Sequence, residues 1–360
     1  MTNSLPRPSA LTAPMGRRDL LRLGGLLGGG LAVSGLLAAC GSGDASTVAG
    51  AGASGSGSAG GSVGSGKTIG ISLNGNNAYS SYVAEGVYKA LDGTSYKVAG
   101  VQNNFTSSTE LSNIQNLLSQ GIAGLCVLPA DATTIAKAAQ LCAQQDVPVG
   151  NALWPGKGDA DQYYAGVAAL DSVEGGKMIG EWLKKNAKPG PVIVVQAIIG
   201  QGFSERIDEG LDAALSGSGF TVVVRDQGFF DRDKATKIVE SGLQAHPDVT
   251  AIVAYSASMS NGIASYLKAN DITTITHVSS DGDDEMFTWL GTPYLAADRY
   301  YSAAQTGLVV AEAVRAQLEG KEVTFSGTIA QSMVTKDTAQ AAIDANPYRY
   351  KEFADRASAI

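Results

Sequence analysis

The sequence predicts an α/β protein of two doubly wound parallel-sheet lobes joined by three hinge crossings. From Lys67 onward, short apolar runs alternate with segments whose apolar residues recur at helical spacing. This alternation is typical of parallel sheets that are covered by helices on both faces. The pattern starts again after residue 167. Roughly 320 residues follow the N-terminal leader, a length that suits two lobes better than one small core.

The first lobe is expected to contain residues 67–167 and 299–336. Five apolar runs in the first of these segments predict strands: Thr68–Leu73, Tyr96–Val101, Ile122–Val127, Val147–Val149 and Tyr163–Val167. Helical spacing between them is visible in two sets of residues: Leu111, Ile114, Leu117 and Leu118, and then Ile135, Ala138 and Leu141. Each run therefore fits a strand followed by a covering helix.

Residues 168–298 repeat the pattern and are expected to form the second lobe. Asp171 is a plausible N-cap for a helix that carries Ile179 and Leu183. The strands expected next are Val192–Ala197, Thr221–Val224, Ala251–Tyr255 and His277–Ser279. The helices expected between them are Ser204–Leu215, Asp233–Leu243 and Met259–Leu267.

The last segment returns to the first lobe. Leu295–Asp298, a helix over Ala303–Leu318 and the strand-like Val323–Ile329 would complete that lobe. The chain then crosses between the lobes three times. Residues 337–360 read as a helical tail with Pro347, for which the sequence predicts no role.

The N-terminus reads as an export signal followed by a tether. Arg17 and Arg18 precede a Leu/Gly/Ala-rich run, which is the order of an export leader. The paired arginines resemble a twin-arginine signal, with an ordinary Sec leader as the alternative. Leu37 to Cys40 resembles the lipobox of bacterial lipoproteins, so residues 1–39 would be removed and Cys40 would carry a lipid. Residues 40–66 are mostly Gly, Ser and Ala and predict a flexible linker.

Charge and side-chain chemistry exclude several classes of function. The whole chain carries −8 and residues 1–39 carry +3, which leaves −11 for the mature part. This charge disfavours nucleic acid as a partner. Cys126 and Cys142 fit buried free thiols or a disulfide. No metal-ligand spacing stands out and the two histidines, His246 and His277, lack a nearby nucleophile pattern, so neither a metal, a cofactor nor an enzymatic activity is expected.

The ends of the predicted strands carry the candidate binding residues. In open parallel sheets, ligands bind beyond the carboxyl ends of the strands, so two facing lobes would form a cleft lined by strand-end loops. Polar and aromatic residues lie at these ends: Asn76, Asn77, Tyr79, Gln102–Asn104, Trp154, Phe203, Phe229, Phe230, Ser256, Asp281, Tyr300 and Tyr301.

A series of short motifs resembles type I periplasmic binding proteins, in the branch of ribose-binding-like sugar-binding proteins of ABC importers. The resemblance covers roughly residues 68–333. The stretches that carry it are Gly70–Asn77 with Tyr79, Gln102–Asn104, Ile114–Asp131, Asp146–Val149, Asp171–Lys177, Phe230–Arg232, His246–Val249, Ser280–Gly282 and Leu295–Ala297. Each is weak alone, and their order and spacing make the resemblance specific.

The resemblance implies roles for individual residues. Asn77 matches a polar donor of the first lobe and Tyr79 a ring that stacks on the ligand. Phe230 matches an aromatic on the opposite wall, and Asp281 a carboxylate that accepts ligand hydroxyls. Ser256 stands where the family usually has Asn.

Other positions depart from the family pattern. Tyr301 stands where the family often has Gln, and Leu153 and Trp154 replace an Asp-Arg pair that grips the sugar ring. Arg206 is shifted by one residue relative to a family arginine, which rotates a helical side chain by about 100°. The expected ligand-binding residues are Asn77, Tyr79, Trp154, Phe203, Arg206, Phe230, Ser256, Asp281 and Tyr301.

The expected function is that of a monomeric, extracytoplasmic solute-binding lipoprotein, anchored to the cell membrane through Cys40. It would close around a sugar or polyol and deliver it to an ABC permease with its ATPase subunit. A nucleoside or small aromatic ligand is the first alternative, and a chemoreceptor accessory is the second. A tethered hydrolase would need a nucleophile and base that the sequence does not supply, and a transcriptional regulator would need a helix-turn-helix before the first strand.

Overall fold

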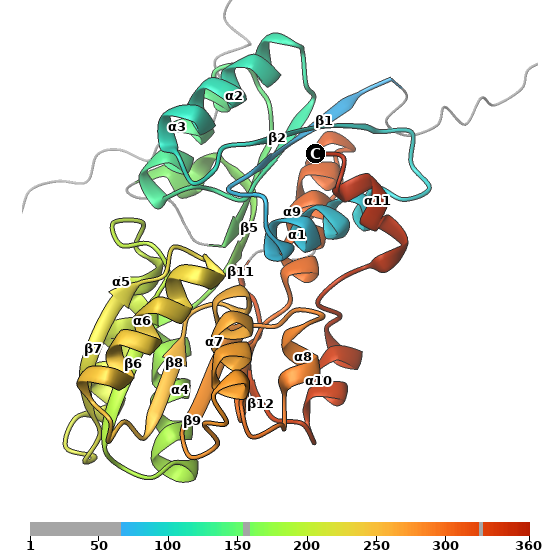
Figure 1. Cartoon of the computed structure of the whole chain (residues 1–360). Coiled ribbons are helices and arrows are strands. Elements are labelled where there is room, and N and C mark those ends of the chain that lie inside the picture. Colours follow the sequence, from blue (N-terminus) through green and yellow to red (C-terminus); the bar gives the residue numbers. More distant parts are fainter. Residues whose placement is uncertain (1–65, 154–158, 324–326) are drawn as a thin grey trace, which may run out of the picture. The chain divides into compact units, whose positions relative to one another are not determined.

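The computed structural model describes residues 66–153, 159–323 and 327–360, which lie in one compact unit spanning Ala59–Ile360 (Figure 1). The export leader, Cys40, nearly all of the predicted linker and Trp154 fall outside the described residues. Within the described part, none of the helices combines the length and apolar character that a membrane crossing requires.

The first sheet has six strands, all parallel. Across the sheet the strands are β11 (Gly327–Thr328), β5 (Tyr164–Ala169), β4 (Val149–Leu153), β3 (Gly124–Val127), β1 (Thr68–Leu73) and β2 (Lys97–Gln102). The elements that accompany this sheet are α1 (Ala78–Ala90), α2 (Ser107–Ser119), α3 (Ala132–Ala143), the 3₁₀ turn η2 (Asp159–Tyr163) and α9 (Ala303–Leu318). The strands are almost wholly apolar because both faces of the sheet are covered.

The second sheet repeats this plan with one antiparallel edge strand. Across the sheet the strands are β12 (Ser332–Val334), β10 (Ala297–Tyr300), β9 (Thr276–Asp281), β8 (Ala251–Ala254), β6 (Pro191–Gln196) and β7 (Thr221–Gln227). Its helices are α4 (Ser172–Asn186), α5 (Phe203–Leu215), α6 (Arg232–Ala245), α7 (Ala257–Ala269), α8 (Met286–Trp289) and α10 (Ala339–Ala345). β12 pairs antiparallel with β10.

In both sheets the order in which successive strands are added reverses at an equivalent strand. In the first sheet β1 lies between β2 and β3, and in the second β6 lies between β7 and β8. This strand order is that of doubly wound folds, in which the crevice beyond the carboxyl ends at the point of reversal binds ligands. The predicted fold class is confirmed.

Each lobe contains a helix pair in close contact through reciprocal glycines. A Cβ added at Gly86 of α1 would lie 1.9 Å from the carbonyl oxygen of Ala304 in α9, and one at Gly307 would lie 1.8 Å from that of Val83. In the second lobe, a Cβ at Gly210 of α5 would lie 1.9 Å from the carbonyl oxygen of Val173 in α4. Helix backbones touch at these points, so each crossing requires a residue without a side chain.

The chain crosses between the lobes as expected and then once more. The three predicted crossings follow β5, β10 and β11. A fourth follows α10, because the 3₁₀ turn η3 (Lys351–Phe353) and α11 (Ala354–Ala357) pack on α1 of the first lobe. The tail, for which the sequence predicted no role, is therefore part of the folded domain.

The strand pairing corrects the predicted lobe boundaries. Residues 299–336 were expected in the first lobe, but Arg299 and Tyr300 belong to β10 and Ser332–Val334 to β12, both in the second sheet. Conversely, Ala168 and Ala169 belong to β5 of the first sheet. The short β12 pairs with the edge of β10. A segment of three residues is too short for its own sequence to predict this long-range pairing.

Some local predictions made from caps and periodicity are confirmed, whereas β4 (Val149–Leu153) and β11 (Gly327–Thr328) differ from the predicted Val147–Val149 and Val323–Ile329. The bounds of β1 and α9 agree with the sequence-based ranges, and the Asp171 side chain accepts a hydrogen bond of 3.1 Å from the backbone N–H of Glu174. Cys126 and Cys142 are both buried and free. Burial raises the pKa of each thiol to about 12, so neither is reactive at neutral pH.

Candidate functional site

A cavity lies where the strand ends of the two sheets meet. Both lobes contribute its lining residues: Asn74, Asn77, Ala78, Tyr79, Phe105 and Leu153 from the first, and Gln201, Phe203, Phe230, Ser256, Ala257, Ser258, Asp281, Gly282, Asp283 and Tyr301 from the second lobe and the crossing after β10. Five of these side chains are aromatic rings. The cavity is therefore mainly apolar with a few polar groups, which is the usual composition of a small-molecule site.

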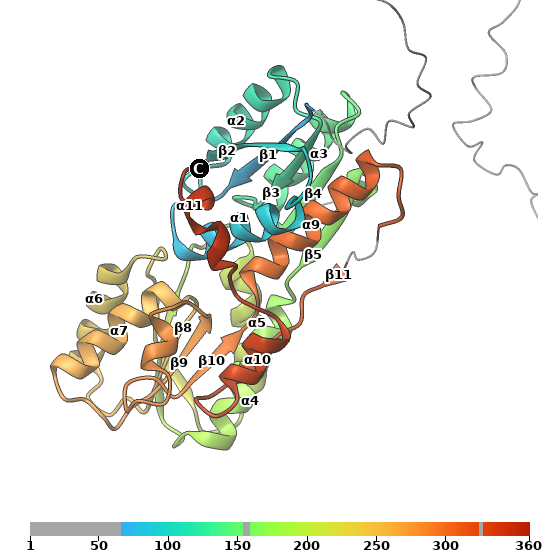
Figure 2. The ribbon, with the colours of Figure 1, turned by 90° about the vertical axis from the view of Figure 1, so that its right-hand side faces the viewer.

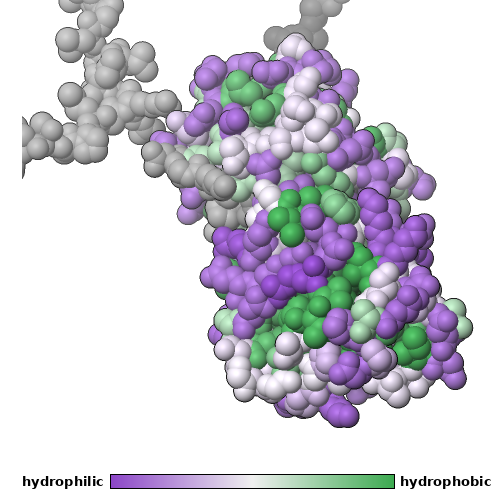
Figure 3. Space-filling model, turned by 60° about the vertical axis from the view of Figure 1, so that its left-hand side comes forward, coloured by the Kyte–Doolittle hydropathy of each residue, from purple (hydrophilic) through white to green (hydrophobic). Residues whose placement is uncertain are grey.

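Two large apolar side chains close in sequence to the lining residues are exposed. Ile199 and Phe229, which lie close in sequence to the lining residues Gln201 and Phe230, are 47% and 43% exposed. On the face shown in Figure 3, apolar surface forms a band across the middle, bordered by polar surface.

The turns after β1 and β2 hold the first-lobe residues. Asn77 caps α1, with its side chain accepting a 3.0 Å hydrogen bond from the backbone N–H of Ser80. The side chain of Asn74 accepts from the hydroxyl of Ser80 at 3.1 Å, and its carbonyl accepts from the N–H of Phe105 at 2.5 Å. These bonds join the two turns and place Phe105 beside Asn77.

A buried carboxyl group supports the Phe105 turn from behind. Glu110 is fully buried, and its Oε2 accepts hydrogen bonds from Asn103 Nδ2 at 2.8 Å and from the N–H of Ala130 at 2.6 Å. Burial raises its pKa to about 8, so this group is protonated at neutral pH. From α2 it links the two turns that follow β2 and β3.

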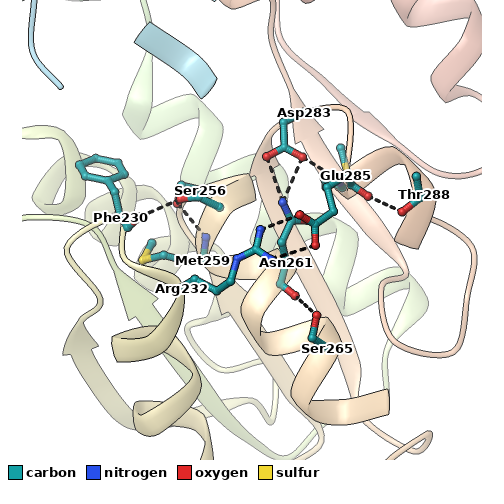
Figure 4. Close-up of polar contacts among 11 residues, drawn as sticks. Phe230, Arg232, Ser256, Met259, Asn261, Ser265, Asp283, Glu285 and Thr288 are labelled. Atoms are coloured by element: carbon teal, nitrogen blue, oxygen red, sulfur yellow. Dashed lines mark hydrogen bonds and ion pairs between the residues drawn. The ribbon is translucent and has the colours of Figure 1, made fainter. Parts of the chain in front are cut away.

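In the second lobe, the residues come from the starts of α5 and α7 and the turn after β7. Phe203 is the first residue of α5, and Ser256 caps α7 by accepting from the N–H of Met259 (Figure 4). The hydroxyl of Ser258 donates to the carbonyl of Phe230 at 2.9 Å. Phe230 is thereby fixed to the start of α7.

Asp281 is a buried carboxylate in the cavity lining. It is 7% exposed and accepts a hydrogen bond from the hydroxyl of Tyr301. Burial raises its pKa to about 6, although Tyr301 and the positive charge of Arg299 act in the opposite direction. The fully buried Arg299 lies with its guanidinium 4.9 Å from the Tyr301 ring centroid and 5.8 Å from that of Phe203. At neutral pH Asp281 is therefore an ionised acceptor, stabilised by a cation behind the aromatic wall.

Of the acidic residues that follow Asp281, Asp283 caps the short helix α8. Asp283 Oδ1 accepts from the N–H of Met286 at 2.6 Å, and the Asn261 amide donates to both carboxylate oxygens at 3.0 and 3.1 Å (Figure 4). Glu285 pairs with Arg232 at 2.6 Å. In the part of the chain that the structure describes, no group of three or more His, Cys, Asp or Glu side chains is placed to hold a metal ion.

Aromatic side chains meet across the cavity. Phe105 of the first lobe stacks on Phe230 of the second, with ring centroids 5.0 Å apart and an interplanar angle of 13°. Tyr79 meets Tyr301 edge to face at 5.9 Å, and Phe203 lies 6.4 Å from Phe230. Both walls therefore present aromatic rings on which the apolar face of a small ligand can pack.

The structure brings together seven of the nine predicted site residues: Asn77, Tyr79, Phe203, Phe230, Ser256, Asp281 and Tyr301. Their contact with a ligand stays a prediction. Contrary to the prediction, the structure does not place Arg206 in the cavity lining. Arg206 lies exposed on α5, while its neighbour Ile207 is buried. The one-residue shift thus turns the arginine away from the cavity. Trp154 lies outside the described residues.

Sequence reasoning missed several lining residues, above all Phe105. It follows Gln102–Asn104 at the end of β2, so the strand-end rule could have included it. Asp283 was missed as well; it caps α8 and also lines the cavity. His277 is buried, and its Nδ1 bonds the carbonyl of Tyr294 at 2.8 Å. Burial lowers its pKa to about 4.

Residues 69–322 match the periplasmic binding protein domain family. The chain belongs to this family. Membership implies an extracytoplasmic location and agrees with the fold of two parallel-sheet lobes. The matched range includes every lining residue of the cavity but ends before β11, β12 and the C-terminal elements.

Curated relatives cover most of the domain. The ribose import binding protein of Escherichia coli is 27% identical over 263 residues, which are 72% of this chain and 88% of that protein. The xylitol-binding protein of Mycolicibacterium smegmatis is 22% identical over 289 residues, 77% of this chain and 80% of that protein.

Solved structures share the fold. A carbohydrate-transporter solute-binding protein from Agrobacterium radiobacter, in complex with D-arabinose, gives a TM-score of 0.70 at 18% identity and covers 78% of this chain and 98% of its own. A solute-binding protein from Bacillus halodurans with bound myo-inositol gives 0.69 at 17% identity with the same coverage.

Proposed function

We propose that this protein is the solute-binding component of an ABC importer and binds a sugar or polyol in the cavity between its lobes by hinge closure. The observation that carries the proposal is a buried carboxylate, Asp281, at one end of a cavity whose walls are aromatic rings from both lobes. Hydroxyl groups of a polyol would donate to Asp281, and its C–H faces would pack on the rings.

In this proposal, closure of the lobes is what tells the permease that a ligand is bound. Lining residues come from two lobes, so a ligand that contacts both favours the arrangement in which the lobes meet. A permease that recognises this arrangement would accept the ligand, and its ATPase subunit would drive transport. The protein itself would perform no chemistry. The named ligands of the relatives, ribose, xylitol, D-arabinose and myo-inositol, support a polyhydroxylated ligand.

The proposal includes attachment to the outer face of the cell membrane through lipidated Cys40, after twin-arginine export. Its support is the sequence pattern Leu37 to Cys40 and the Arg17–Arg18 pair. Mass spectrometry of the membrane-bound protein should find diacylglycerol on Cys40, and Cys40→Ser should release the protein from the membrane. Membrane-bound Cys40→Ser protein would argue against this anchor.

A nucleoside or small aromatic is the second candidate ligand. It is favoured by the five rings of the lining and by Leu153, which stands where the resembled family has a charged grip. Stacking on Phe105 and Phe230 would suit a flat base, and Asp281 would accept from a ribose hydroxyl. The same closed form could also dock on a chemoreceptor.

A thermal-shift screen of the full chain with Cys40→Ser tests the proposal. The panel contains pentoses, hexoses, polyols, nucleosides, amino acids and small aromatics. A ligand that binds only the folded protein raises the melting temperature by mass action. We expect a concentration-dependent rise with one or a few sugars or polyols and a dissociation constant confirmed by calorimetry. A rise confined to another class would replace the proposed ligand, and turnover of the bound compound would refute a role limited to binding.

A further inference from the structure

The C-terminal segment 346–350 joins the two lobes beside the cavity. It follows α10, which packs on β12 of the second lobe, and leads into η3 and α11, which pack on α1 of the first (Figure 2). This segment lies beyond the residues that match the family. Its contacts therefore belong to this chain's own C-terminal elements.

The segment is anchored on the first lobe through a buried carboxylate. Glu85 of α1 is 1% exposed; its Oε1 accepts from Arg349 Nη2 at 2.7 Å and its Oε2 from the N–H of Tyr350 at 2.7 Å. The Arg349 guanidinium also lies 4.8 Å from the ring centroid of Tyr82. The carbonyl of Tyr348 accepts from the N–H of Ala304 at 3.2 Å.

From this anchor, two side chains reach a carboxylate of the second lobe. Asp284 Oδ1 accepts from the Tyr348 hydroxyl at 2.5 Å, and its Oδ2 accepts from Arg349 Nη1. The Tyr348 ring also packs on Phe287 with centroids 4.9 Å apart. Burial alone would raise the pKa of Asp284, but the hydrogen bonds from Tyr348 and Arg349 outweigh it and lower that pKa. Arg349 thus links one carboxylate from each lobe.

The linked residues adjoin the cavity lining. Asp284 directly follows Asp283, which lines the cavity with Asp281. Tyr300 and Ser302, on either side of the lining residue Tyr301, donate to the carbonyls of Asn346 and Pro347. Displacement of the segment would therefore break hydrogen bonds to both the 281–284 turn and the crossing after β10.

We propose that residues 346–350 form an interlobe strap in which Tyr348 and Arg349 are positioning residues for the binding site. Anchored on Glu85, they hold Asp284 and with it the turn that carries Asp281, in the arrangement where Phe105 stacks on Phe230. The strap favours the closed lobes and so raises ligand affinity. Its effect on affinity rests on the proposed function, whereas its effect on lobe arrangement does not.

The expected magnitude is modest, because the Asp284 side chain is 44% exposed. Exposed ion pairs contribute little, and hydrogen bonds between charged groups contribute more. A loss of closed population lowers apparent affinity by the same factor. We expect Asp284→Ala to weaken binding about three- to tenfold.

The test measures lobe arrangement without relying on a ligand. In the full chain with Cys40→Ser, spin labels are placed at Lys137→Cys on α3 and Lys237→Cys on α6, both exposed positions in different lobes. Double electron–electron resonance spectroscopy then gives the distribution of distances between the two labels. It is measured first in the free protein and then with xylitol or D-ribose added as the probe ligand. Cys126 and Cys142 are buried and stay unlabelled.

Four variants separate the strap from general destabilisation. Asp284→Ala should shift the distribution toward longer distances, and Asp284→Glu, which keeps the charge, should restore it. Arg349→Lys should act between them, because an ammonium group cannot bridge two carboxylates as a guanidinium does. Glu285→Gln is the matched control, since Glu285 pairs with Arg232 inside the second lobe.

Each outcome decides the proposal. A longer interlobe distance in Asp284→Ala, reversed in Asp284→Glu and absent in Glu285→Gln, supports the strap. An unchanged distribution in Asp284→Ala overturns it, whatever the ligand. A shifted distribution in a protein that binds no sugar or polyol of the panel would leave the strap standing and reject the proposed ligand class.

Discussion

Replacing Asp281 by Asn should separate the stability of the protein from its binding. The substitution removes the carboxylate charge and keeps the shape of the side chain. Asp281 has φ 88°, a left-handed conformation that Asn tolerates better than most residues. The backbone can therefore accept the change, and the effect reports on the charge.

The magnitude follows from the pKa of Asp281, which burial raises from 3.8 to about 6. One pKa unit corresponds to about 1.4 kcal/mol, so ionising this group in the folded protein costs about 3 kcal/mol. Between pH 3.8 and 6 the folded state binds more protons than the unfolded state. This group therefore makes the wild-type protein lose stability as the pH rises through that window. The Asp281→Asn variant does not lose this stability, because its amide does not titrate.

Urea unfolding at several pH values between 4 and 7.5 measures the difference. Relative to wild type, Asp281→Asn should gain up to about 3 kcal/mol in the free energy of unfolding between the two ends of the range. Any constant cost of the buried amide is the same at every pH and cancels. A difference that is independent of pH, or that falls as the pH rises, would refute the argument.

Binding should change in the opposite direction. A hydrogen bond to a charged group contributes about 1.5–3 kcal/mol, so Asp281→Asn should weaken binding of the identified ligand about ten- to hundredfold at pH 7.5. Asp298→Asn is the control, because Asp298 is fully buried with a pKa raised by burial but does not line the cavity. It should gain stability with rising pH and keep its affinity.

Three further substitutions and one labelling experiment test other parts of the structure. Phe105→Ala should weaken binding at least fivefold, or about 1 kcal/mol by calorimetry, because one stacking wall is lost. Gly86→Ala should lower the free energy of unfolding by about 2–4 kcal/mol in urea, since overpacking at the helix contact outweighs the gain in helix propensity; a stabilised variant would contradict the contact. Glu110→Gln should abolish a loss of stability that the wild type shows as the pH rises from 4.5 to about 8. Cys126 and Cys142 should react with a thiol reagent only after unfolding.

The fold could be predicted because its signals are local. The bounds of β1 and α9 and the cap at Asp171 follow from apolar periodicity and one side chain, and the structure has all three. The cavity could be located because parallel strands end at a common edge, so residues such as Ser256 and Asp281 meet although they lie far apart in sequence.

The remaining features depend on contacts that no local pattern contains. Glu85 and Arg349 are 264 positions apart, and neither the helical pattern of α1 nor the short C-terminal helices indicate that they pair. The antiparallel β12 has three residues and takes its place only because β10 offers an open edge. Arg206 was included among the site residues although its one-residue shift rotates the side chain by about 100°, and the structure places it exposed and outside the cavity lining.

Backbone strain around the cavity shows a second limit of sequence-based prediction. Four lining residues other than glycine have positive φ: Phe105 (57°), Leu153 (96°), Phe230 (56°) and Asp281 (88°). Such conformations cost of order 1–3 kcal/mol each and persist where the surroundings impose them. Glycine would relieve this strain at every one of these strand ends. Turn propensity alone therefore does not predict a large or charged side chain at these four strand ends.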